Sequence, residues 1–260
     1  MASKLNKRRK YVLEVLSEVP ISSTQQLAEL AKVSTETMRK DLDALSDEGS
    51  IIKVHGGVAL ASAPDTEIPF DLRTTRNHKE KKLIANKAIS LIQKDDIIVL
   101  ESCTTNFEVA KGLTKNPELL ETLIVITNSF SIVSAFDGGR KCKKIFFLGG
   151  WVNPVQYASL GHHTARMLQE FHVNKAFLSC AAIGSDFLIT GYHEHDVEFQ
   201  KIALKAAQKK ILMADHSKFN KAAIFSITQL SNFDYLVTDN EFTDEELSYL
   251  NEHNIIYIKT

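Results

Sequence analysis

The stretch from residue 33 to residue 58, VSTETMRKDLDALSDEGSIIKVHGGV, limits the possible folds more than any other part of the chain. Ser34 can cap a helix in which Met38, Leu42 and Leu45 recur at intervals of four and three residues. These apolar residues therefore form one buried stripe, and the other face of the helix is polar. The first turns of the polar face carry hydroxyl groups and two cations, which is typical of a helix that enters a DNA groove.

A β-hairpin is expected directly after this helix. Gly49 is suited to end the helix, because the residue after a helix often has left-handed backbone angles. Two short apolar runs follow, Ile51–Val54 and Val58–Leu60, and His55-Gly56-Gly57 joins them. We expect this ribbon to be a wing that lies along the phosphate backbone, with Lys53 and His55 near its tip.

Two further helices are expected upstream. Residues 5–18 place Val12 and Leu16 on one apolar stripe, and Ser23-Thr24-Gln25-Gln26 is a capping-box pattern that opens a second helix ending near Ala31. Together with the third helix and the hairpin, they predict a winged helix-turn-helix. A small helical bundle with no role in nucleic-acid binding also fits the pattern.

The overall charge does not decide between these two interpretations. The formal net charge is −1, so only the placement of the basic residues can make a DNA-binding face. The basic residues that could share one face are Lys4, Lys7, Arg8, Arg9, Lys10, Arg39, Lys40 and Lys53.

This arrangement resembles the DNA-binding domain of DeoR-type bacterial transcriptional regulators. The resemblance implies operator DNA as a partner, with Thr37, Arg39 and Lys40 at the DNA and residues 55–57 in the wing. Asp41 also matches the motif, and we expect it in a structural salt bridge or cap, because an acid that faces phosphate is repelled. The matching residues are Arg8, Val12, Leu16, Ser34, Thr37, Met38, Arg39, Lys40, Asp41, Leu42, Leu45, Gly49, Lys53, Val54, His55, Gly56 and Gly57. The expected DNA-contacting residues are Ser34, Thr35, Thr37, Arg39, Lys40, Lys53, His55, Gly56 and Gly57.

A domain boundary is expected after the wing. Residues 61–75 contain two prolines, scattered polar residues and little periodicity, which is typical of a linker. Helical spacing returns from Arg76 to Ser90, with Lys79, Lys81 and Lys82 expected on the exposed side. The expected domains are therefore residues 1–60, a linker at 61–75, and residues 76–260.

The second domain is predicted to be α/β. Short, nearly continuous apolar runs alternate with helical segments from Asp95 onward, which favours a mainly parallel, Rossmann-like sheet covered on both faces. The expected strands are Ile97–Leu100, Leu123–Thr127, Ile145–Leu148, Ala176–Ile183, Ile211–Ala214, Tyr235–Thr238 and Ile255–Ile258.

Residues that follow these strands are candidates for a binding site, because ligands of open α/β sheets bind outside the carboxyl ends of the strands. The first strand is followed by Glu101-Ser102-Cys103-Thr104-Thr105, whose hydroxyl and amide groups at a helix start suit a phosphate. A later strand is followed by Asp215 and Lys218, an acceptor for sugar hydroxyls and a cation for an anion. Each motif alone is more typical of a helix cap, but together they favour a pocket for a phosphorylated sugar.

The same strand ends extend the DeoR resemblance over nearly the whole chain. It implies a sensor domain that resembles ribose-5-phosphate isomerase and glucosamine-phosphate deaminase folds and that binds phosphorylated sugars without converting them. Glu101 and Cys103 stand where the family has aspartate and glycine, and Ser179 and Ala182 stand where glycines often occur, which would reshape the pocket. The expected effector-binding residues are Glu101, Ser102, Cys103, Thr104, Thr105, Thr127, Asn128, Gly149, Gly150, Lys201, Asp215 and Lys218.

Other functional classes are disfavoured. The three cysteines show no CxxC spacing, so we expect neither a disulfide framework nor a zinc ribbon, and no metal or cofactor. No apolar run approaches the roughly 20 residues of a membrane span, and we expect a cytoplasmic protein. A homodimer or homotetramer is expected, because paired recognition helices must reach half-sites roughly 34 Å apart.

Two alternatives remain open. The first is a sugar-phosphate isomerase or deaminase on the same fold, with Glu101, Asp215 or Glu198 as general base. The first 60 residues would have no obvious use in such an enzyme. The second is an N-terminal module that binds protein rather than DNA, for which salt-sensitive duplex binding would be absent.

Overall fold

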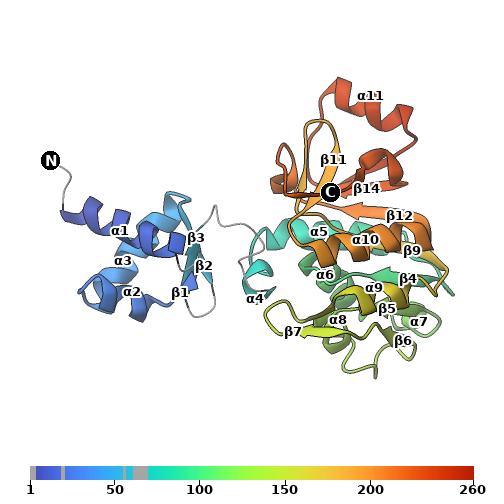
Figure 1. Ribbon diagram of the computed structural model, residues 1–260, viewed down its shortest axis with the longest axis horizontal. Coiled ribbons are helices and arrows are strands. Elements are labelled where there is room, and N and C mark those ends of the chain that lie inside the picture. Colours follow the sequence, from blue (N-terminus) through green and yellow to red (C-terminus); the bar gives the residue numbers. More distant parts are fainter. Residues whose placement is uncertain (1–3, 19–20, 55–56, 61–69) are drawn as a thin grey trace. The chain divides into compact units, whose positions relative to one another are not determined.

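The computed structural model describes residues 4–18, 21–54, 57–60 and 70–260 (Figure 1). The chain divides into two compact units, residues 1–76 and residues 77–260. His55 and Gly56, and most of the expected linker, lie outside the described residues. Within the expected linker, residues Phe70–Arg73 form the short helix α4.

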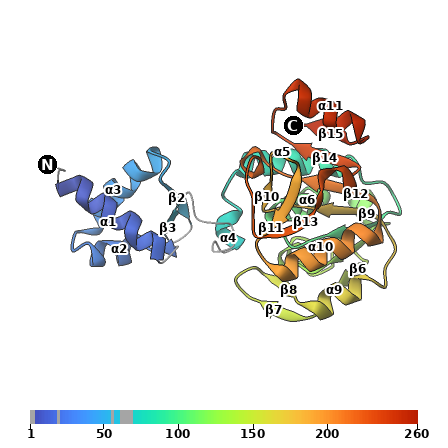
Figure 2. The same ribbon diagram turned by 45° about the horizontal axis from the view of Figure 1, so that its top comes forward.

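The N-terminal unit is a winged helix-turn-helix, as predicted (Figures 1 and 2). Its hairpin is completed by a short strand that the sequence analysis did not predict, β1, which pairs with β3 so that the sheet order is β1-β3-β2. Met38, Leu42 and Leu45 are buried in its core, as the stripe predicted. The elements are α1 (Lys4–Glu18), β1 (Ile21–Ser22), α2 (Thr24–Leu30), α3 (Thr35–Asp47), β2 (Ile51–Val54) and β3 (Gly57–Leu60).

Local signals set the ends of these helices. Ser23 and Gln26 form the predicted capping box at the start of α2. Ser34 caps α3, and its side-chain oxygen accepts a hydrogen bond from the backbone N–H of Thr37. Gly49 has a φ of +70°, the left-handed conformation that glycine adopts without strain just after a helix.

The C-terminal unit is built on a seven-stranded sheet in which every neighbouring pair is parallel, in the order β15-β14-β12-β9-β4-β5-β6. These strands are β4 (Ile97–Leu100), β5 (Ile124–Thr127), β6 (Ile145–Phe147), β9 (Val173–Leu178), β12 (Ala207–Met213), β14 (Tyr235–Thr238) and β15 (Ile256–Lys259). The predicted α/β class and parallel sheet are confirmed.

Helices cover both faces of this sheet. The helices of this unit are α5 (His78–Ile89), α6 (Thr104–Leu113), α7 (Pro117–Leu120), α8 (Phe130–Ala135), α9 (His162–Leu168), α10 (Glu194–Ala206) and α11 (Asp244–Glu252), with 3-10 turns η1 (His216–Lys218) and η2 (Leu230–Asn232). No helix in the described part of the chain is both long and apolar enough to cross a membrane.

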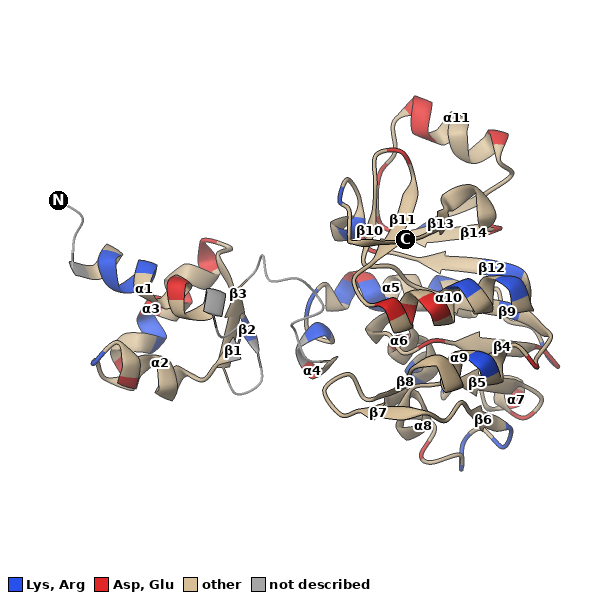
Figure 3. Ribbon diagram, viewed as in Figure 1, with Lys and Arg blue, Asp and Glu red and all other residues tan. Residues whose placement is uncertain are grey.

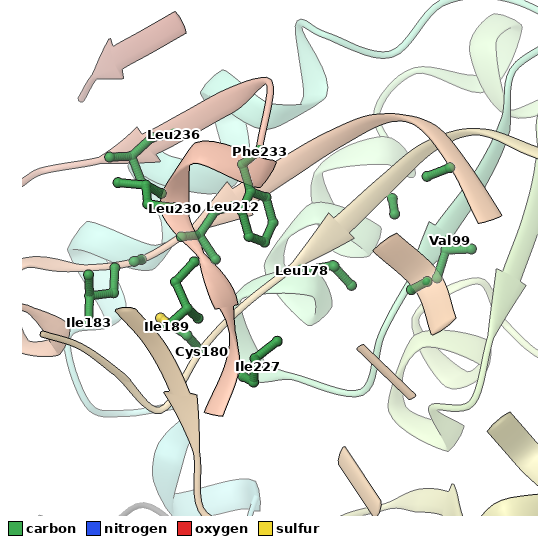
Figure 4. Packing of buried hydrophobic residues seen from close by; sticks show 14 of the residues in the cluster. Val99, Leu178, Cys180, Ile183, Ile189, Leu212, Ile227, Leu230, Phe233 and Leu236 are labelled. Carbon is green, nitrogen blue, oxygen red and sulfur yellow. The ribbon is translucent and has the colours of Figure 1, made fainter. Parts of the chain in front are cut away.

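Successive residues of the central strands belong alternately to two separate hydrophobic cores. In β4, Ile98 and Leu100 belong to the core that also contains residues of α5, α6 and α8, whereas Val99 belongs to the core that contains residues of α9, α10 and α11. In β12, Leu212 lies in the second core, which Figure 4 shows around Leu178 and Leu236. The two-residue period of a strand thus produces a sheet buried on both faces.

The run Ala176–Ile183 is not one strand as predicted. It divides into β9 and a short strand, β10 (Ala182–Ile183), which belongs to a separate antiparallel sheet with β11 (Leu188–Gly191) and β13 (Phe225–Gln229). The chain leaves the parallel sheet at Ser179, whose backbone N–H donates to the side chain of Glu101 instead of to a neighbouring strand. A second small hairpin, β7 (Trp151–Asn153) with β8 (Ala158–Leu160), was also not predicted.

The exposed face of the helix after the linker differs from the prediction. Lys79 and Lys82 are exposed as expected, but Lys81 is buried, and Leu83 is exposed instead. The side-chain period of α5 places residue 81 on the same face as Ile84, Ala85 and Ala88, which pack against α6 and the sheet.

Candidate functional sites

Helix α3 presents most of its expected DNA-contacting residues to solvent. Thr35, Arg39 and Lys40 are exposed, and the side chain of Arg39 has a relative accessibility of 68%, with Glu36 at 3.8 Å. Thr37 is half-buried, and its hydroxyl lies 2.8 Å from the hydroxyl of Ser34, so this pair is partly occupied by the helix cap. The exposed face therefore offers one guanidinium, one ammonium and one hydroxyl group.

Asp41 has the structural role that the sequence analysis assigned to it. Its carboxylate is buried and bonds the side chain of Arg8, and Arg9 Nε lies 3.5 Å from its other oxygen. Arg9 also donates to Glu48 at 3.1 Å. The hypothesis that Arg8 and Arg9 belong to a shared basic face is therefore wrong, because both guanidinium groups tie α1 to α3 within the unit.

A groove of about 550 Å³ lies beside α3. Thr35, Arg39 and Asp43, at successive intervals of four residues, form one wall, and the start of α2 and the wing complete it. Lys53 of the wing is exposed and donates to Asp43 at 2.6 Å, which raises the lysine pKa. Figure 3 shows the mixture of basic and acidic residues on these elements.

Gly57 lies in the wing for a packing reason. A Cβ atom at this position would be 2.3 Å from the carbonyl oxygen of Ser22, so only glycine permits β3 to approach β1 this closely. The pairing of β1 with β3 holds the wing against the start of α2. Gly57 is therefore required for the close packing of β3 against β1 in the wing.

The C-terminal unit has its strand-order reversal at β4. The chain passes from β4 to β5 and β6 on one side, and then to β9, β12, β14 and β15 on the other. The carboxyl ends of strands on either side of such a reversal form the crevice in which ligands of α/β folds bind. Glu101 follows β4 and Ser179 follows β9, so both lie at this point.

Glu101 links three elements at the reversal. One carboxylate oxygen accepts from the backbone N–H of Ser179, and the other accepts from Gln200 Nε2 of α10 at 2.9 Å. Gln200 also donates to the carbonyl of Ser179 at 3.0 Å. Burial raises the pKa of Glu101 to about 7, although these hydrogen bonds act in the opposite direction.

A chain of hydrogen bonds joins the loops after β4, β5 and β6. Asn128 accepts from the backbone N–H of Ser102 at 2.9 Å and donates to the carbonyl of Ser159 at 3.0 Å. The hydroxyl of Ser159 lies 3.1 Å from that of Thr164, which donates to the carbonyl of Gly149 at 2.9 Å. These loops are therefore positioned by side chains from each other.

The glycine pair and Thr127 have different roles in this arrangement. A Cβ at Gly150 would lie 2.1 Å from Thr164 Oγ1, so a side chain is excluded there, whereas the space around Gly149 is open. Thr127 is fully buried and accepts from the backbone N–H of Ser129 at 3.1 Å. Thr127 thus shapes the turn after β5.

The start of α6 holds the other hydroxyl residues of the expected site. Thr104 and Thr105 are buried, and the sulfur of Cys103 caps the helix by accepting from the backbone N–H of Asn106 at 3.2 Å. The hydroxyl of Ser102 is buried and has no hydrogen-bond partner among the described residues. A buried polar group of this kind usually has a hydrogen-bond partner, and none of the described residues supplies one to Ser102.

Cys180, which the sequence analysis did not select, marks where the expected residues gather. Burial raises the pKa of the Cys180 thiol to about 12, and the charges that act on it come from Lys218, Asp215, Glu101 and Cys103, in that order. Charged residues that follow β4 and β12 therefore lie near enough to Cys180 to act electrostatically on its thiol. The labelled Cys180 lies beside Ile189 and Ile227 in Figure 4, at the border of the hydrophobic core.

Asp215 is held in place by its neighbours. It is buried, and its Oδ1 accepts from the backbone N–H of Ser217 at 3.0 Å and from Asn77 Nδ2 at 2.8 Å. His216 contacts Asp239 at 2.5 Å, and this hydrogen bond raises the pKa of His216. The turn that carries Lys218 is thus fixed from both sides.

Lys201 belongs to helix α10 and not to a loop that follows a strand. It is exposed on α10, and the preceding residue, Gln200, is the one that contacts Glu101. The sequence analysis missed Gln200, Asn77 and Cys180. The residue types alone gave no signal for these three, because their partners lie far away in the chain.

Comparison with family models matches both units. Residues 8–63 match the model of the DeoR-like helix-turn-helix domain, and residues 76–240 match that of the DeoR C terminal sensor domain. The two matches together extend over most of the chain.

Curated relatives match along nearly their whole length. An HTH-type transcriptional regulator of Haemophilus influenzae is 31% identical, with 95% of this chain and 94% of the relative covered. The L-fucose operon activator of the same species is 26% identical, covering 98% of this chain and all of the relative. The HTH-type transcriptional repressor GlcR of Bacillus subtilis is 29% identical, covering 88% and 86%. Among solved structures, ribose 5-phosphate isomerase A of Methanocaldococcus jannaschii is similar, with a TM-score of 0.39 and 17% identity over 55% of each chain.

Proposed function

The chain belongs to the DeoR family of helix-turn-helix transcriptional regulators, and on this premise we propose that it represses a sugar-metabolism operon under the control of a phosphorylated sugar. Helix α3 enters the major groove of the operator, where Thr35, Arg39 and Lys40 reach base edges and phosphates. The wing, with Lys53, follows the phosphate backbone. The exposure of these side chains supports this role, since the unit does not use them in its core.

The buried hydroxyl of Ser102 is the observation that carries the effector proposal. It lies between Glu101 and the start of α6, where backbone amides and the hydroxyls of Thr104 and Thr105 suit a phosphate. Lys218 supplies a cation, and Asp215 accepts hydrogen bonds from sugar hydroxyls. This combination of an anion site and a buried acceptor fits a small phosphorylated polyol.

We propose that the protein acts as a dimer or tetramer of this chain, since two recognition helices must meet half-sites about one duplex turn apart. The effector changes the arrangement of the two recognition helices relative to each other. It can do so only because its affinity differs between the two arrangements.

The engaged state of Glu101 supports a regulator without turnover. Both oxygens of Glu101 accept hydrogen bonds, one from the backbone N–H of Ser179 and the other from Gln200. A general base must bring an oxygen within hydrogen-bond reach of the substrate proton, and these two bonds hold the Glu101 oxygens toward Ser179 and Gln200. Incubation with aldose, ketose and amino-sugar phosphates, followed by nuclear magnetic resonance, is therefore expected to show no isomer and, from the amino sugar, no free ammonia.

Separate variants test the two sites. Arg39→Ala is expected to weaken binding to a duplex selected from a random library by at least tenfold, while binding of sugar phosphates measured by calorimetry stays unchanged. Thr104→Ala and Lys218→Ala are expected to retain DNA binding and to lose the response to the sugar phosphate. Arg140→Ala, which removes an exposed arginine of the C-terminal unit, is the matched control.

Two results would contradict these assignments. Equal loss of DNA and sugar-phosphate binding in Arg39→Ala would remove the separation of the two sites. A normal response in both Thr104→Ala and Lys218→Ala would place the effector elsewhere. Whether the effector releases or tightens DNA is read from the same titrations in the wild type.

A further inference from the structure

Asn77 is the first residue of the C-terminal unit, directly after Arg76, the last residue of the N-terminal unit. It occupies the cap position of α5 with left-handed angles, φ 47° and ψ 39°, yet its side chain makes no capping hydrogen bond. Positive φ values are uncommon outside glycine, and asparagine is among the residues that tolerate them. The side chain of Asn77 instead bonds residues outside α5.

The partner of Asn77 is the turn that carries Lys218. Asn77 Nδ2 donates to Asp215 Oδ1 at 2.8 Å and lies 3.1 Å from the hydroxyl oxygen of Ser217. Asp215 is 3% exposed, so this contact is shielded from solvent and is stronger than a surface hydrogen bond to a carboxylate. The junction residue is thus bonded directly to a residue that the proposed function places in the effector site.

Helix α5 also packs against α6, the helix that begins at the other half of that site. His78 Nδ1 lies 3.8 Å from Glu108 Oε1 of α6, and a Cβ at Gly112 would lie 2.4 Å from the Cδ1 atom of Ile89. Gly112 thus permits a close approach of the two helices. Since α6 begins at Thr104, α5 packs against the helix that starts at one proposed binding segment, and its cap residue, Asn77, bonds the other.

We propose that Asn77 is the residue that couples effector binding to the chain leading to the DNA-binding unit, an inference that rests on the proposed function. A sugar hydroxyl that donates to Asp215 redistributes the hydrogen bonds of the Asp215 carboxylate. The bond from Asn77 then lengthens or breaks. Since this bond diverts Asn77 from capping α5, its loss changes the backbone angles at residue 77 and hence the direction in which residue 76 leaves the unit.

The test compares the coupling ratio, which is the dissociation constant for DNA with effector divided by that without it. The full chain is titrated against a duplex selected from a random library, with ribose 5-phosphate, glucose 6-phosphate, fructose 1-phosphate and inorganic phosphate as probes. The wild type is expected to change its affinity for DNA at least tenfold with one of the sugar phosphates. Asn77→Gly, in which glycine keeps the left-handed angles without the side chain, is expected to reduce that change to less than twofold.

Binding of the effector itself is the readout that separates coupling from damage to the site. Calorimetry is expected to give Asn77→Gly an effector affinity within threefold of the wild type. Asn254→Gly is the matched control, because Asn254 is an exposed asparagine with a φ of 55°, and this variant is expected to keep the full coupling ratio. Asn77→Asp, which places a second carboxylate beside Asp215, is expected to lose coupling as Asn77→Gly does.

Three outcomes overturn the proposal in distinguishable ways. A full coupling ratio in Asn77→Gly means that the signal does not pass through this side chain. Loss of effector binding in Asn77→Gly makes Asn77 a binding residue and not a coupling residue. If no probe binds the wild type, the proposed effector class is wrong, and the coupling proposal falls with it.

Discussion

Two of the buried carboxylates of this protein, Asp41 and Glu101, are held in contrasting ways. Asp41 in the N-terminal unit is paired with the guanidinium of Arg8 and lies near that of Arg9. Glu101 in the C-terminal unit receives hydrogen bonds from a backbone amide and an amide side chain, with no ion pair recorded for it among the described residues.

This difference follows from what each unit must do. An ion pair joins α1 to α3 and leaves the exposed face of α3 free for DNA. At the strand ends of the C-terminal unit, a cation paired with Glu101 would be partly neutralised by that carboxylate and would attract the proposed phosphate less strongly. Neutral donors hold the Glu101 loop, and the cation, Lys218, comes from a different strand end.

The largest expected effect is a pH dependence caused by Glu101. Its pKa in the folded protein, about 7, lies above the ordinary value of 4.5, so the ionised carboxylate is disfavoured by folding. The stability contributed by protonated Glu101 is fully present below pH 4.5 and is lost as the pH rises through 7. The loss amounts to about 3 kcal/mol, from about 1.4 kcal/mol per pKa unit.

Urea denaturation of the wild type and of Glu101→Gln at pH 5 and pH 8 measures this effect. The free energy of unfolding of the wild type is expected to fall more between the two pH values than that of Glu101→Gln. Both proteins have the same histidines, so the contribution of histidine titration cancels when the two changes in unfolding free energy are subtracted. Parallel pH profiles would mean that Glu101 is already ionised at pH 5.

The second effect concerns the ion pair of the N-terminal unit. Asp41→Ala is expected to destabilise this unit by about 2 kcal/mol, because two arginine side chains, each 22% exposed, lose their buried partner. Hydrogen exchange at the backbone amides of α3 measures the change in the full chain. Asp43→Ala on the same helix is the control, and its exposed ion pair with Lys53 is expected to contribute less than about 0.5 kcal/mol. A similar cost in both variants would remove the distinction between a buried and an exposed acid.

The smallest expected effect tests whether the exposed acid Asp43 weakens binding to DNA. Asp43→Asn frees Lys53 and removes a negative charge from the groove beside α3, so it is expected to strengthen binding to random duplex DNA about threefold at low salt. Fluorescence anisotropy between 50 and 200 mM salt, roughly the range over which phosphate contacts weaken, measures this change. Asp95→Asn, in the C-terminal unit, is the control and is expected to bind as the wild type does. An unchanged affinity in Asp43→Asn would place Asp43 and Lys53 away from the phosphates.

Sequence periodicity predicted the main helices and strands, and the motif residues carried the resemblance to the DeoR family. Met38, Leu42 and Leu45 are buried as their spacing predicted, and Ser34 and Gly49 bound α3 as expected. These are local properties, since a cap or a helical stripe depends on neighbours within a few residues. The prediction that Lys81 is exposed was wrong, because the burial of α5 against α6 and the sheet overrides the usual preference of lysine for solvent.

The residues of the candidate site also divide into those that the sequence predicted and those that it did not. Glu101, Ser102, Thr104 and Asp215 were selected because they follow strands, and all strands of a parallel sheet end at one edge. Gln200 and Asn77 could not be selected in this way. Gln200 is 99 positions from Glu101, and Asn77 is 138 positions from Asp215.

The chain's own residue order therefore determined a winged helix-turn-helix, a parallel α/β unit and the loops in which polar groups occur, because these follow from backbone preferences and the burial of regularly spaced apolar side chains. Only the tertiary structure decided which polar groups meet. The strand order reverses at β4 and brings β9 beside it, and this places Ser179 and Gln200 around Glu101. Such contacts depend on the packing of whole elements, and no short window of residues contains the information that specifies them.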